Sequence, residues 1–377
     1  MLIVPYGILI GFMLAILGFF RNLHSLRLLA SGVSADDLGQ TTVIIAARNE
    51  EQVIEKTVRG LLERAPAEAR LIVVDDNSKD STWEILQKLS SEFPCLLALR
   101  NNGRSGKAGA LNVALDNLQG DFVVFLDADA HVDWSFIRQY IAVFSNPSVN
   151  AIFSDFEPYN SSRTPSVIFQ DLFFGFIKTF VYSGIFSKTV FMNSGFFIRR
   201  SVLDTLGKFD PETTVDDFDL GLRLKKEGMD IKFILGNKCR IQYAFTIGDL
   251  FRQYCRWFTG GIRKLLPERK PLSGVSLMVI IIVALIGFFP HIALVTGFAT
   301  GIPLIGAKIA GAYVVVLASA SVFGYIFHEK RPRREVLFNL FVGTVSMYFI
   351  FQAVIFVSFF RALGKKDDWY KVSRKAD

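Results

Sequence analysis

The stretch that decides the fold is "DFVVFLDAD", residues 121–129. Its uninterrupted apolar run, with two valines, predicts a strand buried on both faces of a sheet. Similar runs occur earlier in the chain, separated by segments whose apolar residues have helical spacing. This alternation predicts a mostly parallel α/β sheet covered by helices. The expected strands are 41–47, 70–76, 95–100 and 121–127, and the expected helices are 50–65, one from Ser81, and 107–118.

Polar side chains follow these strands at the points where they end. "RNE" follows the first strand, "DDNS" the second and "DAD" the fourth. The carboxyl ends of parallel strands meet at one edge of the sheet, where such sheets bind their ligands. The sequence therefore predicts one ligand site built from these strand ends.

The sharpest signal is the pair Asp127 and Asp129, which flank one small residue. Two carboxylates at a strand end suit Mg²⁺ or Mn²⁺, which take oxygen ligands and substrate phosphates. The alternative for this pattern is a solvated turn, but a buried strand before it favours the metal. The isolated histidines and the three scattered cysteines form neither a zinc pattern nor a disulfide framework.

Two further polar segments suit a nucleotide. Asp75 and Asp76 can accept hydrogen bonds from a base or a ribose, although a helix cap and turn would also use them. "GRSGKAGALN", residues 103–112, is a glycine-rich loop whose amides and Lys107 can meet phosphates. The spacing is not that of a P-loop, and no G-x-G-x-x-G follows the first strand, which disfavours a dinucleotide enzyme.

The acidic segment "VDDFDLGLRL", residues 215–224, opens a predicted helix. Its carboxylates can complement the helix dipole, which is the structural interpretation. The functional interpretation is a general base, for which Asp217 is the candidate.

Four apolar segments predict membrane helices, since a span takes roughly 20 apolar residues. Basic residues flank these segments in the positive-inside pattern, so we expect an integral protein of the plasma membrane with its α/β domain in the cytoplasm. No small-residue cleavage site follows the first segment, which favours an anchor over a signal peptide. The segments are 1–20, 271–298, 303–327 and 336–360.

The net charge of +7 comes largely from these flanking residues. A surface for nucleic acid is the alternative, but the basic clusters follow the span ends, so we expect no nucleic-acid partner. Three full crossings after the α/β domain would place the basic tail outside. Either the tail departs from the rule, or one segment is interfacial or re-entrant.

The Phe-rich segment 166–186 has only two charged residues. As an exposed helix it would present too much aromatic surface to water. We expect it to lie on the bilayer or to line the entrance for an acceptor, with packing in a protein core as the alternative.

In this order, "VVDDNS", "GKAGALN", "DAD", "VDDFDLGLRL" and "QYCRW" resemble the motifs of the membrane-bound family 2 glycosyltransferases. That group includes cellulose, hyaluronan and poly-N-acetylglucosamine synthases and ceramide glucosyltransferases. The resemblance covers residues 41–261 and implies a GT-A fold, a Rossmann-like and mostly parallel α/β sheet, joined to transmembrane helices. It also implies inverting, metal-dependent transfer from a nucleotide-diphosphate sugar. "VDD", residues 215–217, stands where the family has T-E-D, so the last position of the motif, that of the base, still holds an aspartate, Asp217.

The resemblance implies a role for each matching residue. Asp217 would be the catalytic base, and Lys107 would approach the diphosphate. Asp127 would contact the nucleotide and, with Asp129, hold Mg²⁺ or Mn²⁺. The expected nucleotide-sugar pocket also contains Ala46, Arg48, Glu50, Asp75 and Asp76.

Gln253, Arg256 and Trp257 match the Q-x-x-R-W motif of the membrane-bound branch. Gln253 and Arg256 lie three residues apart and so share one helix face. The resemblance implies that Arg256 meets the diphosphate while Trp257 caps the acceptor site. An interfacial anchor helix would also use Trp and Arg and is the alternative.

The expected organisation has five parts. These are a transmembrane anchor at 1–22, a GT-A domain at 40–246, an interfacial amphipathic helix at 247–268, a membrane bundle at 271–361 and a basic tail at 362–377.

The expected function is sugar transfer, with UDP as the expected carrier, to a growing polysaccharide or oligosaccharide at the bilayer. The alternative is a lipid glycosyltransferase that adds one sugar to a membrane lipid. A bundle of about four spans is small for a polymer channel, so a synthase would need a channel-forming partner or a homo-oligomer. A non-enzymatic transporter or scaffold is disfavoured, because the spans carry almost no ionisable residues.

Overall fold

We analysed a computed structural model of the 377-residue chain. It describes residues 40–160 apart from 64 and 68, 164–182, 194–265 apart from 230, 291–329 and 333–364, with scattered positions between 10 and 20. The basic tail, most of the first predicted span and most of the second lie outside the described residues.

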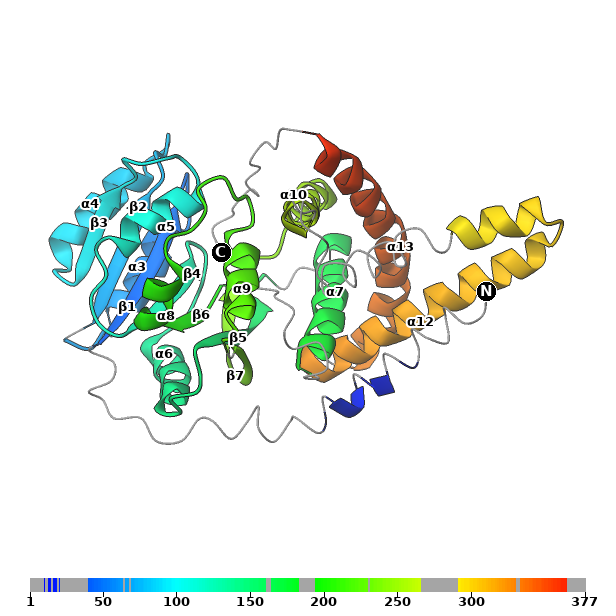
Figure 1. The fold of residues 1–377 in the computed structure, drawn as a ribbon, viewed down its shortest axis with the longest axis horizontal. Helices are drawn as coiled ribbons and strands as arrows, with labels where there is room; N and C mark the ends of the chain where they lie inside the picture. Colours follow the sequence, from blue (N-terminus) through cyan, green and yellow to red (C-terminus); the bar gives the residue numbers. More distant parts are fainter. Residues whose placement is uncertain are drawn as a thin grey trace. The chain divides into compact units, whose positions relative to one another are not determined.

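The described chain divides into two compact units, one built on a sheet and one built from helices. The sheet has the strand order β3-β2-β1-β4-β6-β5-β7, with β1 to β4 side by side and parallel (Figure 1). β6 pairs antiparallel with both β4 and β5, and β7 pairs parallel with β5. The strands are Thr41–Ala47 (β1), Arg70–Asp75 (β2), Leu96–Arg100 (β3), Phe122–Asp127 (β4), Ala151–Pro158 (β5), Phe196–Arg199 (β6) and Ile231–Ile241 (β7).

The predicted α/β sheet with mostly parallel strands is confirmed, and the first four strands lie within one residue of their predicted bounds. β1 and β2 are almost fully buried, as continuous apolar runs require when helices cover both faces of a sheet, and β4 is buried at three of its six residues. β3, at the edge of the sheet, buries only Leu96. The helices of this unit are Ile54–Leu62 (α3), Thr82–Glu92 (α4), Lys107–Leu115 (α5), Trp134–Ile141 (α6), Arg200–Leu206 (α8) and Asp216–Lys226 (α9), with a short 3₁₀ turn at Ala142–Ser145.

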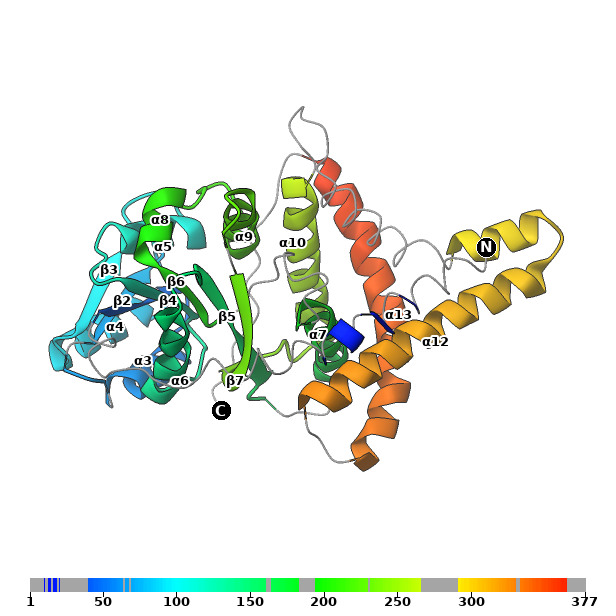
Figure 2. The same ribbon diagram turned by 60° about the horizontal axis from the view of Figure 1, so that its bottom comes forward.

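Among the residues that the structure describes, the helical unit contains four long helices, which Figure 2 shows from a second side. They are Pro165–Tyr182 (α7), Ile247–Leu265 (α10), Pro303–Glu329 (α12) and Arg333–Leu363 (α13). Within the described parts of the chain, none of the helices combines the length and the apolar character that crossing a bilayer requires. The membrane spans therefore stay predictions.

Residues 166–182 of the Phe-rich segment lie in α7, which belongs to the helical unit. Phe169 and Phe173 are buried, and both rings lie against Tyr254 of α10, at 5.4 and 5.0 Å between ring centroids. Phe173 also meets Phe351 of α13 at 5.8 Å. For Phe169 and Phe173 the structure shows packing in a core, which is the alternative interpretation, and contact of the segment with a bilayer or an acceptor stays a prediction.

Candidate active site

The carboxyl ends of the parallel strands bring the predicted polar residues to one edge of the sheet. The register pairs Ala46 of β1 with Asp127 of β4, and Ala47 with Asp75 of β2. Asp75 is in turn paired with Arg100 at the end of β3. Strand pairing alone thus places the ends of four neighbouring strands together, as the sequence predicts.

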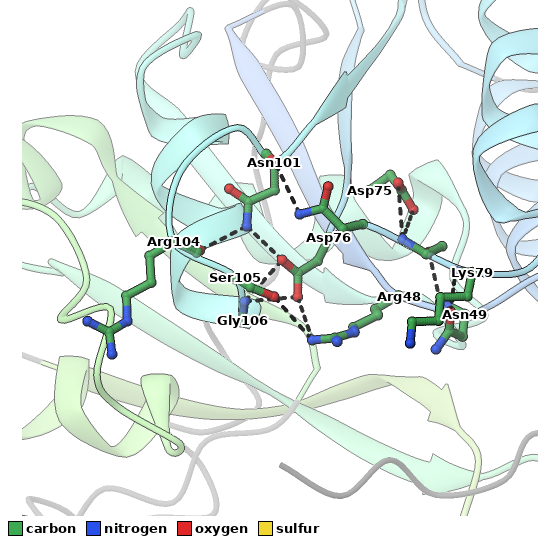
Figure 3. A network of polar contacts seen from close by, with 11 residues as sticks. Arg48, Asn49, Asp75, Asp76, Lys79, Asn101, Arg104, Ser105 and Gly106 are labelled. Carbon is green, nitrogen blue, oxygen red and sulfur yellow. Dashed lines mark hydrogen bonds and ion pairs between the residues drawn. The ribbon is translucent and has the colours of Figure 1, made fainter. Parts of the chain in front are cut away.

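Asp76 is the centre of a hydrogen-bond network at this edge (Figure 3). Its carboxylate is 2% exposed and accepts from the Arg48 guanidinium at 3.2 Å and from the Asn101 amide at 2.6 Å. The backbone N–H of Gly106 donates to both of its oxygens, at 3.0 and 2.9 Å. Arg48 and Asp76, both predicted for the nucleotide pocket, are therefore in direct contact, and Asp76 ties the glycine-rich loop to the sheet edge.

Asp75 is fully buried and has a more local role. It accepts from the backbone N–H of Ser78 at 3.3 Å and forms an ion pair with Arg100 at 3.5 Å. The turn that follows contains Asn77 with φ 56°, a left-handed conformation that asparagine tolerates. The contacts of Asp75 thus match the alternative given for it above, a turn-forming residue. Asp76 instead makes the contacts between distant segments of the site.

The glycine-rich loop reaches α5 through two positions where only glycine fits. Gly106, the residue before α5, has φ 124°. A Cβ on Gly109 would collide with the backbone carbonyl of Arg104. The loop thus folds back closely on the first turn of α5, which fixes where Lys107, the first residue of that helix, places its side chain.

Lys107 joins the two acidic segments of the sequence. Its ammonium lies 2.9 Å from Asp127 and 3.5 Å from Asp216. Burial lowers the pKa of Lys107, but the carboxylates of Asp127, Asp216 and Asp217 outweigh it and hold that pKa above its usual range. Lys107 therefore stays a cation, placed where it can meet a diphosphate.

Asp217 has the proton affinity that a general base needs near neutral pH. Burial raises the pKa of its carboxyl to about 7, and the negative charge of Asp216 adds to the rise, while the Lys107 cation opposes it. One oxygen accepts from the backbone N–H of Phe218 at 2.7 Å. A catalytic base works best with a pKa close to the working pH, so this environment fits the predicted role.

Asp129 is 3% exposed and accepts from the backbone N–H of Gln242 at 3.1 Å. The described residues contain no group of three His, Cys, Asp or Glu side chains arranged to hold a metal. A cation here would take the carboxylates of Asp127 and Asp129 and complete its shell with other oxygens, as Mg²⁺ and Mn²⁺ do with substrate phosphates. Gln242, whose backbone N–H contacts Asp129, also carries a buried side-chain amide with no hydrogen-bond partner among the described residues. The residues present therefore fit a divalent cation.

The remaining predicted residues fall in two places. Glu50 is buried in the turn before α3, and its backbone N–H donates a hydrogen bond to the Thr82 hydroxyl at 2.7 Å. Gln253, Arg256 and Trp257 lie on α10 in the helical unit, where the Trp257 ring meets Tyr254 at 5.0 Å.

Three residues of the site were not predicted. Asn101 holds Asp76 and also donates to the carbonyl of Arg104. The Ser194 hydroxyl accepts from the backbone N–H of Asp127 at 2.9 Å. Together with Gln242, these residues show their role only through contacts between distant segments. Asn101 alone had a signal, since it directly follows a strand on the edge that carries the other polar residues.

A comparison with protein families agrees with this geometry. The model for "Glycosyl transferase family 2" matches residues 42–207, which run along the chain from β1 to α8 and leave out α9 and β7. Residues 42–207 are therefore a family 2 glycosyltransferase domain, as the resemblance implied for that part of the chain.

Two curated relatives are similar over more than half of this chain. The beta-monoglucosyldiacylglycerol synthase of Trichormus variabilis is 32% identical over 235 residues, which are 60% of this chain and 49% of the relative. The poly-beta-1,6-N-acetyl-D-glucosamine synthase of Staphylococcus aureus is 27% identical over 239 residues, 63% of this chain and 58% of the relative. The chain spans only about half the length of the curated relatives that it matches.

One solved structure is similar along nearly the whole chain. It is the mannosyltransferase PcManGT from Pyrobaculum calidifontis in complex with GDP-Man and Mn²⁺, with a TM-score of 0.59 and 17% identity. The match covers 97% of this chain and 99% of that one. At this identity the similarity is one of fold.

Proposed function

Since residues 42–207 are a family 2 glycosyltransferase domain, we propose that this protein transfers a sugar from a nucleoside-diphosphate sugar to a membrane-associated acceptor with inversion. The observation that carries the proposal is the Lys107 ammonium, held between Asp127 at 2.9 Å and Asp216 at 3.5 Å, next to the base candidate Asp217. A cation that could stabilise a leaving diphosphate and a carboxylate that could act as a base thus belong to one group of side chains.

The transfer needs one proton acceptor and stabilisation of the leaving group. Asp217 takes the proton of the acceptor hydroxyl, whose oxygen attacks the anomeric carbon of the sugar. A new bond forms from that carbon to the acceptor oxygen, and the bond to the diphosphate breaks. Lys107 stabilises the negative charge that develops on the diphosphate. No second carboxylate is needed as a nucleophile, because a single displacement inverts the carbon.

We propose that the reaction depends on a divalent cation held by Asp127 and Asp129. A bound Mg²⁺ or Mn²⁺ would neutralise charge on the leaving diphosphate. The Mn²⁺ in the mannosyltransferase of similar fold supports this assignment. Asp76, Arg48 and Asn101 would form the nucleotide side of the pocket, where the base or ribose replaces contacts of the network in Figure 3.

Two classes of acceptor are supported. The 32% identity to an enzyme named for a glucosylated diacylglycerol favours a membrane lipid. The 27% identity to a poly-N-acetylglucosamine synthase supports the polysaccharide predicted from the sequence. We place the lipid first because its identity is higher over a region of similar length. The protein would work at the cytoplasmic face of the membrane.

The test is a transfer assay with the purified full chain in nanodiscs. Labelled UDP-sugars and GDP-sugars are supplied with Mn²⁺ or Mg²⁺ and membrane lipids, with EDTA and Asp217→Asn as controls, and the product is sized. A lipid-soluble product one sugar heavier than its acceptor supports the lipid glycosyltransferase. A polydisperse product insoluble in lipid solvents supports the polysaccharide synthase and a search for a channel-forming partner or a homo-oligomer. Absence of metal-dependent transfer or donor hydrolysis with every nucleotide-sugar contradicts the proposal.

A further inference from the structure

Gln242 carries a buried side-chain amide with no hydrogen-bond partner among the described residues. The residue is 5% exposed, and neither its side-chain oxygen nor its side-chain nitrogen has a hydrogen-bond partner in the described part of the chain. Burying an amide in this way is destabilising unless something else completes its hydrogen bonds. A bound ion or ligand is one way in which a native protein completes such a group.

The position of Gln242 is fixed by two backbone contacts with the segment around the Asp127–Asp129 pair. Gln242 directly follows β7, and its own N–H donates to a carboxylate oxygen of Asp129 at 3.1 Å. Two residues earlier, on β7, stands Arg240, which exchanges backbone hydrogen bonds with His131, at 2.8 and 3.3 Å. The end of β7 therefore lies against the residues that follow β4, and Gln242 sits beside the carboxylate expected to hold a cation.

We propose that the amide oxygen of Gln242 is a ligand of the divalent cation at Asp127 and Asp129. This inference rests on the metal-dependent function proposed above. Side-chain amide oxygens are hard ligands of the kind that Mg²⁺ and Mn²⁺ accept. A cation with two carboxylates and two phosphate oxygens still has coordination positions to fill, and Gln242 would fill one of them from the protein.

A water molecule or a sugar hydroxyl could satisfy the same amide, and each would give a different experimental result. A buried water would make Gln242 a structural residue. A hydroxyl of the donor sugar would make Gln242 affect the binding of the donor and not that of the metal. The test must therefore measure metal binding directly, apart from turnover.

The experiment titrates Mn²⁺ into the full chain in nanodiscs, with UDP or GDP present and no acceptor, and follows free Mn²⁺ by electron paramagnetic resonance. Gln242→Leu keeps the size of the side chain and removes the oxygen, so we expect the dissociation constant for Mn²⁺ to rise about tenfold or more. Gln242→Glu keeps an oxygen at the same distance and should bind Mn²⁺ at least as tightly as the wild type. Thr57→Val is the matched control, because Thr57 is a buried hydroxyl of α3 that also lacks a side-chain partner in the described chain.

The proposal is overturned if Gln242→Leu binds Mn²⁺ within about twofold of the wild type. A lower melting temperature together with unchanged binding would identify a structural amide, and a raised KM for the donor with unchanged Mn²⁺ binding would identify a sugar contact. If Gln242→Leu does not fold, the proposal is judged on Gln242→Glu. A tenfold or larger loss of Mn²⁺ affinity in that variant contradicts a role of Gln242 as a ligand of the cation. Absence of Mn²⁺ binding by the wild type with either nucleotide would instead contradict the metal dependence itself.

Discussion

At the scale of single residues, the proton affinity of Asp217 can be measured from the dependence of kcat on pH. Its pKa is raised to about 7 by burial and by Asp216, and only the carboxylate form can accept a proton. We expect kcat to rise with pH up to about 7 and then to level off. Asp217→Asn should lower kcat by about 10²- to 10⁴-fold without preventing nucleotide binding.

The matched control for Asp217 is Asp219→Asn in the same helix. Asp219 forms an ion pair with Arg223 at 3.3 Å. Its neutralisation should therefore leave the rise of kcat with pH, the rising limb of the profile, at the same pH as in the wild type. Steady-state kinetics from about pH 5 to about pH 9 would show the limb. A profile without an inflection near neutral pH in the wild type would exclude Asp217 as the base.

Lys107 sets the position of that inflection. Its positive charge lowers the pKa of Asp217, in opposition to burial and Asp216. Lys107→Met removes the cation, so the pKa of Asp217 should rise further and the rising limb should move to higher pH. Lys107→Arg keeps the charge and should leave the limb close to its wild-type position. The same kinetic series measures both variants, and an unmoved limb in Lys107→Met would show that the two groups are not coupled.

Some of the site could be predicted from the sequence because the residue types themselves carry the chemistry. Asp127, Lys107 and Asp217 are recognisable as candidates for a metal ligand, a phosphate-binding cation and a base, and the structure brings them together. Asn101 and Gln242 could not be predicted in their roles. Each acts through a contact with a distant segment, 25 positions away for Asn101 and Asp76, and 113 for Gln242 and Asp129.

At the scale of elements, the first turn of α5 depends on a close approach of the backbone. Gly109→Ala would push a Cβ into the carbonyl of Arg104, so we expect it to destabilise the protein by about 1–3 kcal/mol. Gly60→Ala is the matched control, because nothing lies within 4 Å of the added Cβ on α3. That change should stabilise by about 0.5–1 kcal/mol, since alanine is the better helix former. Denaturant unfolding compares the two, and equal effects would contradict the close approach.

The role of α10 in catalysis is testable on one helix. Arg256→Ala and Trp257→Ala should each lower turnover if the Q-x-x-R-W motif serves the reaction. Arg252→Ala is the matched control, since Arg252 is about half exposed and pairs with Asp249 at 3.3 Å on the same helix. We expect it to change the melting temperature and turnover little, as for other exposed ion pairs. Wild-type turnover in both Arg256→Ala and Trp257→Ala would favour the anchor-helix alternative.

The elements themselves were predictable where their pattern is strong. β1 to β4 follow from continuous apolar runs, but helix ends were placed less accurately. α3 begins at Ile54 and not at residue 50, because Glu50 to Val53 form a turn whose first N–H binds Thr82. β5, β6 and β7 were not predicted, and β6 is only the short Phe196–Arg199 segment, too brief for its antiparallel pairing to be read from the sequence.

At the scale of the whole molecule, association with membranes is the main prediction still to be tested. We expect the full chain to remain in the membrane pellet after alkaline carbonate extraction, because the apolar segments at 1–22 and 271–361 would hold it in the bilayer. Large apolar side chains exposed on the helical unit, such as Val315 at 63% and Phe349 at 67%, support this expectation. Release by high salt alone would show instead that only the basic clusters hold the protein at the surface.

The path of the chain through α7 limits how the protein can be shortened. α7 lies between β5 and β6 in the sequence but belongs to the helical unit, where Phe169 and Phe173 pack on Tyr254. A chain cut after Tyr243 would keep both phenylalanines and lose the ring that covers them, leaving an aromatic stripe that promotes aggregation. A fragment of the sheet unit that can be purified without detergent therefore needs three changes. The apolar segment at 1–22 and the C-terminal helices are removed, and α7 is replaced by a short polar linker.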